Sequence, residues 1–149
     1  MNDQKITKNR RSVSFTLADG SNVEGYVFLS LYEACHEGPQ RVGDLLNNVE
    51  TFVPVDTSSG MLHLNIGNII AAYTPLSEEK SDLMTLGAKH KVQITTSLGS
   101  VIDGEIFVNL PHERNRVSDY LNQGERFFRI FLAEKIVYIG SGYIVTVRD

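Results

Sequence analysis

The feature that most constrains this chain is a seven-residue stretch that occurs twice. Residues 41–47 read RVGDLLN, and residues 116–122, which lie 75 positions later, read RVSDYLN. Phe52 and Phe127 each follow the stretch by five residues. A repeat at this distance indicates a tandem of two small domains rather than a short-period solenoid.

The match extends along most of the chain with one gap. Residues 41–72 align with residues 116–147 at an offset of 75, and upstream of them the offset becomes 79 because the first copy has four additional residues. Modules this small bury limited surface alone, so we expect them to gain stability from packing together or from further assembly. The predicted organisation is a flexible basic arm over 1–11, a first module over 12–74, a linker over 75–89 and a second module over 90–149.

The composition is that of an ordinary soluble globular protein, with 42% hydrophobic and 21% charged residues. No apolar run approaches the roughly 20 residues that span a bilayer. The polar N-terminus lacks the apolar core of a signal peptide, and the single cysteine, Cys35, excludes an intramolecular disulfide framework. These features favour a cytoplasmic protein.

The net charge of −4 is distributed unevenly along the chain. It is +3 over residues 1–11, −6 over 12–74, −1 over 75–89 and 0 over 90–149. We expect the two copies to present different surfaces, because their charges differ while their apolar positions agree. The arm is expected to be solvated, or to fold on binding an acidic surface such as the first module of a neighbouring chain.

In both modules, alternating apolar and polar residues predict a half-buried first strand and a longer second strand. Gly25 and Gly104 lie at corresponding positions on the inner face of the second strands, where glycine is typical of a sharp bend. Phe28 and Phe107 lie at corresponding positions on the outer faces, among polar residues. We expect these faces to be covered by the packing of two modules or two chains, with a partner or ligand site and a local loop as alternatives.

The repeated stretch predicts a short helix in each module, because its apolar residues recur at helical spacing. Arg41 and Asp44 are three residues apart, so they can form an ion pair or a cap on one helical turn, as can their counterparts Arg116 and Asp119. We interpret these residues as a shared structural motif and not as a catalytic one. Asn47 and Asn122 are predicted to end the helices in the left-handed conformation.

Three further strands follow the helix in each module, and a linker helix joins the modules. The linker helix is expected to cover about ten residues, with Ser77 as its cap and Gly87 at its end. The further strands are predicted over 52–55, 61–66 and 68–73 in the first module, and over 127–132, 136–139 and 143–148 in the second.

Five strands with a bent second strand resemble a small SH3-like or Sm-like barrel. Residues 13–25 (VSFTLADGSNVEG) resemble the opening half of the first Sm motif, and residues 66–69 (IGNI) are similar to the second. The RNA-reading Asp and Asn of that family are not visible after Leu31, and Ile66 stands where the second motif has arginine. The resemblance therefore implies an all-β chain of two tandem five-stranded barrels, each with one short helical turn, but not the RNA site.

The repeated stretch with its following Phe also resembles small bacterial domains that are catalogued as uncharacterised. This resemblance covers both modules, which make up nearly the whole chain. It implies no activity, because none is established for that class.

Motifs of known chemistry are absent from the sequence, which has no Walker loop, no dinucleotide fingerprint and no nucleophile elbow. The dense reactive clusters are Cys35-His36-Glu37 and His112-Glu113. We interpret both as surface loops rather than metal or Cys–His sites, because they fall where the two copies differ. We expect neither a metal nor another cofactor.

Basic residues gather near aromatic ones in the second module, an arrangement that can hold nucleic acid by phosphate contact and base stacking. Seven acidic residues share that module, and Phe128 is expected to point into the core. The basic residues that could serve an interaction are Arg114, Arg116, Arg126 and Arg129.

The sequence therefore favours a non-enzymatic protein-protein interaction or assembly module that is oligomeric. The duplicated fold, the two outward Phe residues and the difference in charge support this expectation. The alternative is an Sm-like RNA-binding protein, in which two modules per chain would build a ring from fewer subunits.

Overall fold

The computed structural model describes residues 8–30, 39–111 and 114–149. Alternating residues form the strands of the first module, and the repeated stretch forms its helix. These elements are β1 (Lys8–Leu17), β2 (Asn22–Ser30), α1 (Val42–Leu46), β3 (Phe52–Thr57), β4 (Gly60–Asn65) and β5 (Ile69–Pro75). The second module repeats them as β6 (Ala88–Thr96), β7 (Val101–Val108), α3 (Val117–Leu121), β8 (Phe127–Phe131), β9 (Lys135–Gly140) and β10 (Ile144–Arg148).

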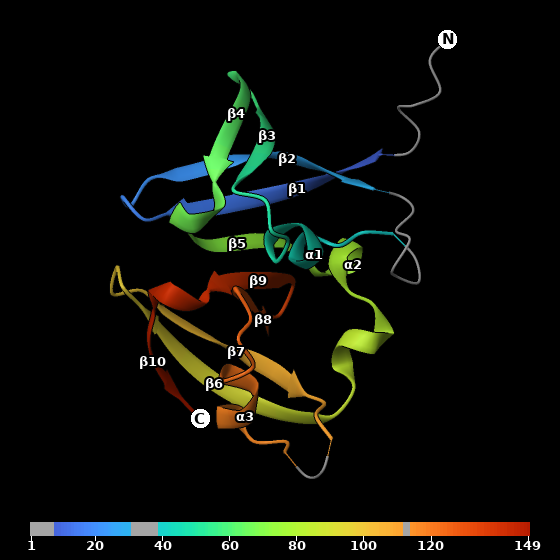
Figure 1. Ribbon diagram of the computed structural model, residues 1–149, viewed down its shortest axis with the longest axis vertical. Helices are drawn as coiled ribbons and strands as arrows, with labels where there is room; N and C mark the ends of the chain where they lie inside the picture. Colours follow the sequence, from blue (N-terminus) through green and yellow to red (C-terminus); the bar gives the residue numbers. More distant parts are fainter. Residues whose placement is uncertain (1–7, 31–38, 112–113) are drawn as a thin grey trace.

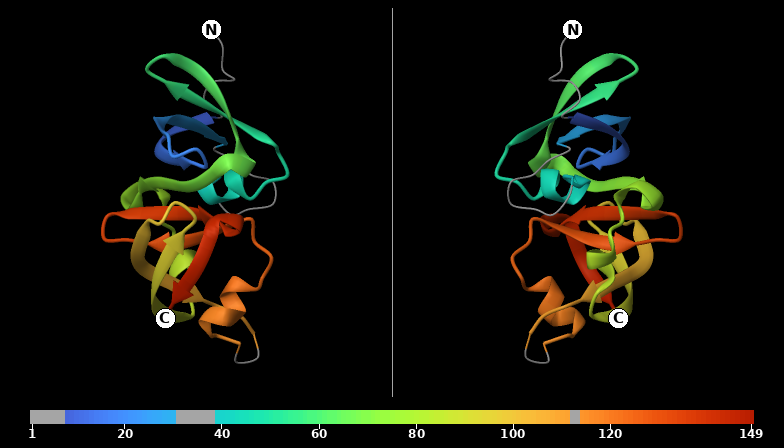
Figure 2. Two further views of the ribbon diagram at one scale, coloured as in Figure 1. Left: turned by 90° about the vertical axis from the view of Figure 1, so that its left-hand side faces the viewer. Right: turned by 90° about the vertical axis from the view of Figure 1, so that its right-hand side faces the viewer.

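All ten strands belong to one antiparallel sheet with the order β10-β6-β7-β8-β9-β5-β1-β2-β3-β4. The five strands of each module keep the same internal order, so the duplication in the sequence is a duplication of topology. Figure 1 shows the two modules one above the other, with β5 and β9 side by side between them. The side views in Figure 2 show the β3–β4 hairpin (green) at the top of the upper module and β10 (red, ending at C) in the lower module.

The junction between the modules is a strand pairing. Ala72 of β5 lies opposite Tyr138 of β9, in a ladder that runs from the pair Ala71–Ile139 to the pair Pro75–Lys135. At the offset of 75, β9 is the counterpart of β4 and not of β5. The two modules are therefore joined head to tail, and no twofold axis relates them.

The hydrophobic core is shared across this junction. One buried cluster contains Val13, Phe15 and Leu29 of the first module together with Phe127 and Tyr138 of the second. A second cluster combines Ile70 and Ala71 of β5 with buried residues of the second module. Because each core needs residues from both copies, the modules are not independently packed domains.

The all-β class, the five strands per module and the short helix in each are confirmed. In the described residues the strands form one open sheet, in which no closed barrel is found. The expected pair of separate barrels is therefore not observed, because the outer side of β5 is bonded to β9 of the other module.

The two inner-face glycines allow neighbouring strands to approach closely. A Cβ atom on Gly25 would lie 2.6 Å from the backbone oxygen of Asp56, and one on Gly104 would lie 2.8 Å from that of Phe131. These oxygens belong to β3 and β8, at the pairs where β2 meets β3 and β7 meets β8. Any larger residue would displace the strand backbone at these crossings.

The linker and the arm differ from the predictions. The expected ten-residue helix is instead the short α2 (Leu76–Glu79), a 3₁₀ turn over Asp82–Thr85 and extended backbone at Lys80 between them. The residue before α2 is Pro75, so Ser77 is not the cap. Residues 8–11, predicted to belong to the arm, form the start of β1, and residues 1–7 lie outside the described part of the chain.

Candidate functional site

A buried carboxylate connects the linker to both modules. Glu79, the last residue of α2, is fully buried and accepts hydrogen bonds from Nη1 of Arg11 and from the Tyr138 hydroxyl. It also accepts the backbone N–H groups of Val42 and Gly43, at 3.1 and 3.3 Å. These N–H groups lie in the first turn of α1 and have no partner within the helix. The carboxylate therefore caps the helix, and its negative charge interacts favourably with the positive end of the helix dipole.

Burial determines the chemistry of this cluster. The Arg11 side chain is 5% exposed, and its Nε lies 3.3 Å from Glu78 on the solvent side. Burial, with the nearby Glu79 carboxylate, raises the pKa of Tyr138 far above its ordinary value, so its hydroxyl remains a hydrogen-bond donor. The sequence pattern did not predict this cluster, because Glu79 fits equally well as an acid in the first turn of a helix.

Tyr138 also fixes the residue type at the start of α1. A Cβ atom on Gly43 would lie 2.6 Å from Cε1 of the Tyr138 ring. The glycine therefore leaves room for a ring that reaches across from the second module. The counterpart of Gly43 is Ser118 and the counterpart of Tyr138 is His63.

Asn47 joins the end of α1 to the second module. Its Oδ1 accepts the Phe127 N–H at 2.8 Å, and its Nδ2 donates to the Phe127 carbonyl oxygen at 3.4 Å. The prediction of a left-handed residue here is wrong, since φ is −89° at Asn47 and −101° at Asn122. Asn122 instead donates from Nδ2 to the carbonyl oxygen of Ser118 within its own helix.

Replacing Asn47 with alanine is expected to lower the free energy of unfolding by about 1–3 kcal/mol, because a backbone N–H and a carbonyl of Phe127 lose their partner. The Asn122→Ala control is expected to cost less than about 0.5 kcal/mol, since its side chain is exposed and bonds within its own turn. Chemical denaturation of both variants, at a protein concentration at which the chain is monomeric, measures the difference. Equal losses would contradict a role for Asn47 at the junction.

Asp44 and Asp119 occupy the same capping position in the two copies. Asp44 accepts the Arg41 N–H at 2.8 Å, and Asp119 accepts the Arg116 N–H at 3.1 Å. Asp119 also forms an ion pair with Arg116, whose Nε lies 3.1 Å from a carboxylate oxygen. The Arg116 side chain and N–H that bond to this carboxylate lower the pKa of Asp119 below its ordinary value. All these contacts lie within one helical turn, as a structural role requires.

The lowered pKa of Asp119 gives a pH prediction. A carboxyl group whose pKa is lower in the folded than in the unfolded state stabilises the fold at any pH above its ordinary pKa, which is 3.8 for Asp119. This contribution is lost as the pH falls through the lowered pKa. Asp119→Asn is therefore expected to lower the melting temperature near neutral pH and to converge with the wild type in acid. A difference that does not depend on pH would contradict the assigned cause.

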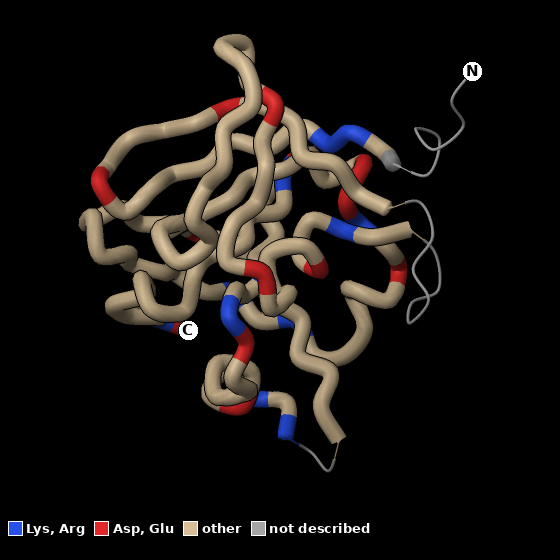
Figure 3. Tube along the Cα trace, turned by 45° about the horizontal axis from the view of Figure 1, so that its top comes forward, with Lys and Arg blue, Asp and Glu red and all other residues tan. Residues whose placement is uncertain are grey.

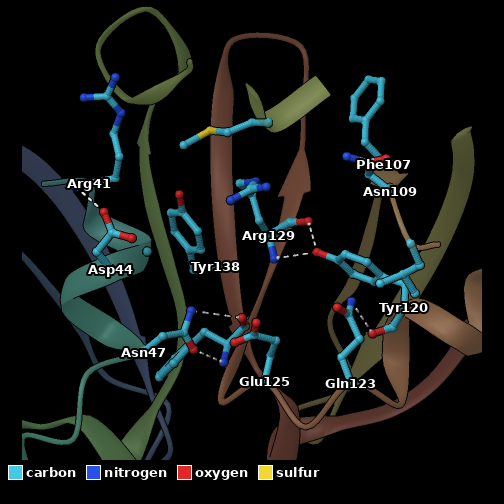
Figure 4. Close-up of a pocket in the computed structure, with 14 residues that line it drawn as sticks. Arg41, Asp44, Asn47, Phe107, Asn109, Tyr120, Gln123, Glu125, Arg129 and Tyr138 are labelled. Carbon is cyan, nitrogen blue, oxygen red and sulfur yellow. Dashed lines mark hydrogen bonds between the residues drawn. The ribbon is translucent and has the colours of Figure 1, made fainter. Parts of the chain in front are cut away.

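A cavity of about 340 Å³ lies at the junction, and side chains from both modules line it. Figure 4 shows Arg41, Asp44 and Asn47 on one side of the cavity, and Tyr120 and other residues of the second module on the other. Charges of both signs line the cavity, so it does not select for an anion or a cation by charge alone.

The four arginines singled out in the second module have different contacts. Arg126 donates from Nη1 to two backbone oxygens of the first module, each at 3.0 Å. Arg129 lines the junction cavity, and Arg114 lies 4.0 Å from Asp119, beside Arg116. Figure 3 shows that acidic and basic residues are interspersed over the chain. Phe128 is buried, as its expected inward position requires.

The two Phe residues of the outer faces lie at different places. Phe107 is half-buried, packs edge-on against Phe131 with ring centroids 5.2 Å apart, and lines the junction cavity. Phe28 is also half-buried, but it lies beside Phe52 in a second cavity of about 300 Å³. Phe107 therefore contributes to the contact between the modules, whereas Phe28 lies near the β4 end of the sheet.

Both reactive clusters noted in the sequence, Cys35-His36-Glu37 and His112-Glu113, lie outside the described residues. Among the residues that are described, no group of three or more His, Cys, Asp or Glu side chains is placed to hold a metal ion. No helix in that part of the chain is long and apolar enough to cross a membrane.

Comparisons with protein-family models, with curated proteins and with solved structures find no match for this chain.

Proposed function

We propose that this protein is a non-enzymatic assembly module that binds protein through the outer strands of its sheet. The observation that supports this most is the exposure of large apolar side chains at both ends of the sheet. Phe52 and Met61 are 54% and 52% exposed at the β3–β4 end, and Val145 is 62% exposed in β10.

A strand at the edge of a sheet can bind a strand of another protein. It presents a row of backbone N–H and C=O groups to which another strand can bond, and the side chains on that edge supply specificity. Natural proteins usually protect such edges with charged residues or proline. In β4 the exposed positions instead include Met61 and Leu62, so the edge is suited to a partner.

Affinity purification of the tagged protein from the cells that produce it, with and without nuclease, tests the proposal. We compare the wild type with the edge variants Leu62→Lys and Val145→Lys, and with Leu83→Lys as a matched control, since Leu83 is an exposed apolar residue in the linker. The expected result is a protein partner that resists nuclease, that Leu83→Lys retains and that the edge variants lose. A partner that both edge variants retain would overturn the proposal.

The alternative function is Sm-like RNA binding. The observation that supports it is that Arg41 and Arg129 line the junction cavity with the rings of Phe107 and Tyr120, an arrangement that could contact a phosphate and a base. Asp44 and Glu125 share this lining and would oppose the phosphate. RNA binding through such a site predicts an affinity that falls steeply with salt and is reduced by Arg129→Ala. An affinity for single-stranded RNA that neither salt nor this substitution changes would exclude it.

A further inference from the structure

We propose that the partner at each end of the sheet is a second copy of this chain, with β10 of one chain paired antiparallel with β4 of the next. This inference rests on the proposed function, because it identifies which protein the edge strands bind. It follows from the topology of the duplication, from the burial of corresponding residues and from the fit of two side chains.

The topological argument concerns which strands are left at the ends. The internal junction joins β5 of the first module to β9 of the second. At the offset of 75, the counterpart of β9 is β4 and the counterpart of β5 is β10. These are the two terminal strands of the sheet. Each chain therefore pairs β5 with β9 internally, and it also carries the counterparts of these two strands, β10 and β4, without a neighbour on their outer side. We call the pairing of such strands, within one chain or between two chains, the joint.

Burial of the corresponding residues supports the same joint. Residues that are buried at the internal junction have exposed apolar counterparts at the ends of the sheet, and the contrast is present on both halves of the joint. The pairs are Phe127 (3% exposed) and Phe52 (54%), Ile136 (0%) and Met61 (52%), Val137 (0%) and Leu62 (42%), and Ile70 (1%) and Val145 (62%). A second chain in the same arrangement would bury all four of these exposed side chains.

The internal ladder also gives the register of the joint. The pair Ala72–Tyr138 corresponds to Val147 of one chain opposite His63 of the next. In the same way, the pair Ala71–Ile139 corresponds to Thr146 opposite Leu64. A shift by one residue would turn the apolar face of β4 away from the core of the neighbouring module.

Two positions differ between the copies in a way that fits the joint. Inside the chain, the large Tyr138 ring requires glycine at position 43. Between chains the counterparts are His63 and Ser118, so a smaller ring meets a residue that has a Cβ atom. Asn122 occupies the place of Asn47, and its side chain would face the backbone of Phe52, as Asn47 faces that of Phe127.

Charge favours this arrangement over a joint between two identical edges. Residues 8–74, the first module with the whole of β1, carry a net charge of −3, whereas residues 90–149 carry no net charge. Pairing β4 with β4 would bring two acidic modules together, whereas pairing β4 with β10 places an acidic module beside a neutral one. A head-to-tail joint repeats until it closes a ring, or it continues as a filament if the rotation does not close.

The experiment combines the mass of the purified protein with a cysteine pairing test. In a Cys35→Ser background, one chain carries His63→Cys and a second, differently tagged chain carries Val147→Cys. Directly opposed residues have Cα atoms about 4.5–5.5 Å apart and can form a disulfide. Val145→Cys is the matched control, because it lies two residues from Val147 in β10, beyond the register shift between Ile144 and Thr146. It is therefore out of register with His63, and the two Cα atoms would lie beyond bonding distance.

The expected result is a mass that is a multiple of 16.6 kDa, with a mixed disulfide for the 63–147 combination and little for 63–145. Leu62→Lys and Val145→Lys should give folded monomers, because both side chains are exposed in the single chain. A monomeric wild type, equal disulfide yields for the two combinations, or assemblies that survive the lysine substitutions would each overturn the inference. A foreign partner bound to the same edges would preserve the proposed function while excluding self-assembly.

Discussion

The Glu79→Ala variant is expected to lose about 3–5 kcal/mol of unfolding free energy, the cost of removing one partner from a buried ion pair. The substitution leaves the Arg11 guanidinium buried with only the exposed Glu78 as a partner, and it removes the acceptor for the Tyr138 hydroxyl. It also removes the cap of α1. Small domains have a total stability of only about 5–15 kcal/mol, so this loss is a large part of it.

Glu78→Ala is the matched control for this prediction. Glu78 also contacts Arg11, but its side chain is 53% exposed. Ion pairs in contact with solvent contribute about 0–1 kcal/mol, so this variant is expected to remain close to the wild type. Urea denaturation of both variants gives the comparison. A loss for Glu79→Ala no larger than that for Glu78→Ala would show that the buried cluster does not hold the modules together.

Gly87→Ala is expected to have the second largest effect. Gly87 has φ of +93°, and an added Cβ atom would lie 2.2 Å from the backbone oxygen of Val108. The left-handed conformation alone costs alanine about 1–2 kcal/mol, and forcing extra volume into a packed site adds about 1–3 kcal/mol. The expected loss of unfolding free energy is the sum of this conformational cost and this packing cost.

Gly99→Ala separates these two contributions. Gly99 has a similar φ of +86°, but nothing lies within 4 Å of the added Cβ atom. It should therefore show the conformational cost without the clash. If denaturation curves give equal losses of unfolding free energy for the two variants, the close contact between the linker and Val108 does not exclude a side chain at position 87.

Repetition made much of the fold predictable from the sequence. A strand pattern that occurs twice with a single gap cannot easily arise by chance, and it located the strands and the helices near their observed positions. The pairing of β5 with β9 was not predicted, because the apolar residues of the two strands indicate that both are buried but not which strand each one pairs with. Pairing between distant strands depends on the three-dimensional fit of the two modules.

The residues of the buried cluster show why the candidate site was harder to predict. Arg11 was assigned to the flexible basic arm and Glu79 to the first turn of the linker helix, since charged residues are rarely buried without a partner. Each is buried because the other is present. Asn47 was predicted to be a left-handed helix end, whereas its side chain bonds to a strand of the other module. In all three cases the deciding partner is distant in sequence.

Amide hydrogen exchange at low and high protein concentration tests most directly the claim that β4 and β10 join chains as β9 and β5 join the two modules. It compares the internal pair with the two terminal strands in the same sample. We expect the amides of β5 and β9 to exchange slowly at both concentrations. The outward-facing amides of β4 and β10, which do not bond to β3 or β6, should become protected only at the higher concentration. Fast exchange in β5 and β9 would contradict the continuous sheet. Exchange in β4 and β10 that ignores concentration would contradict the joining of chains through these strands.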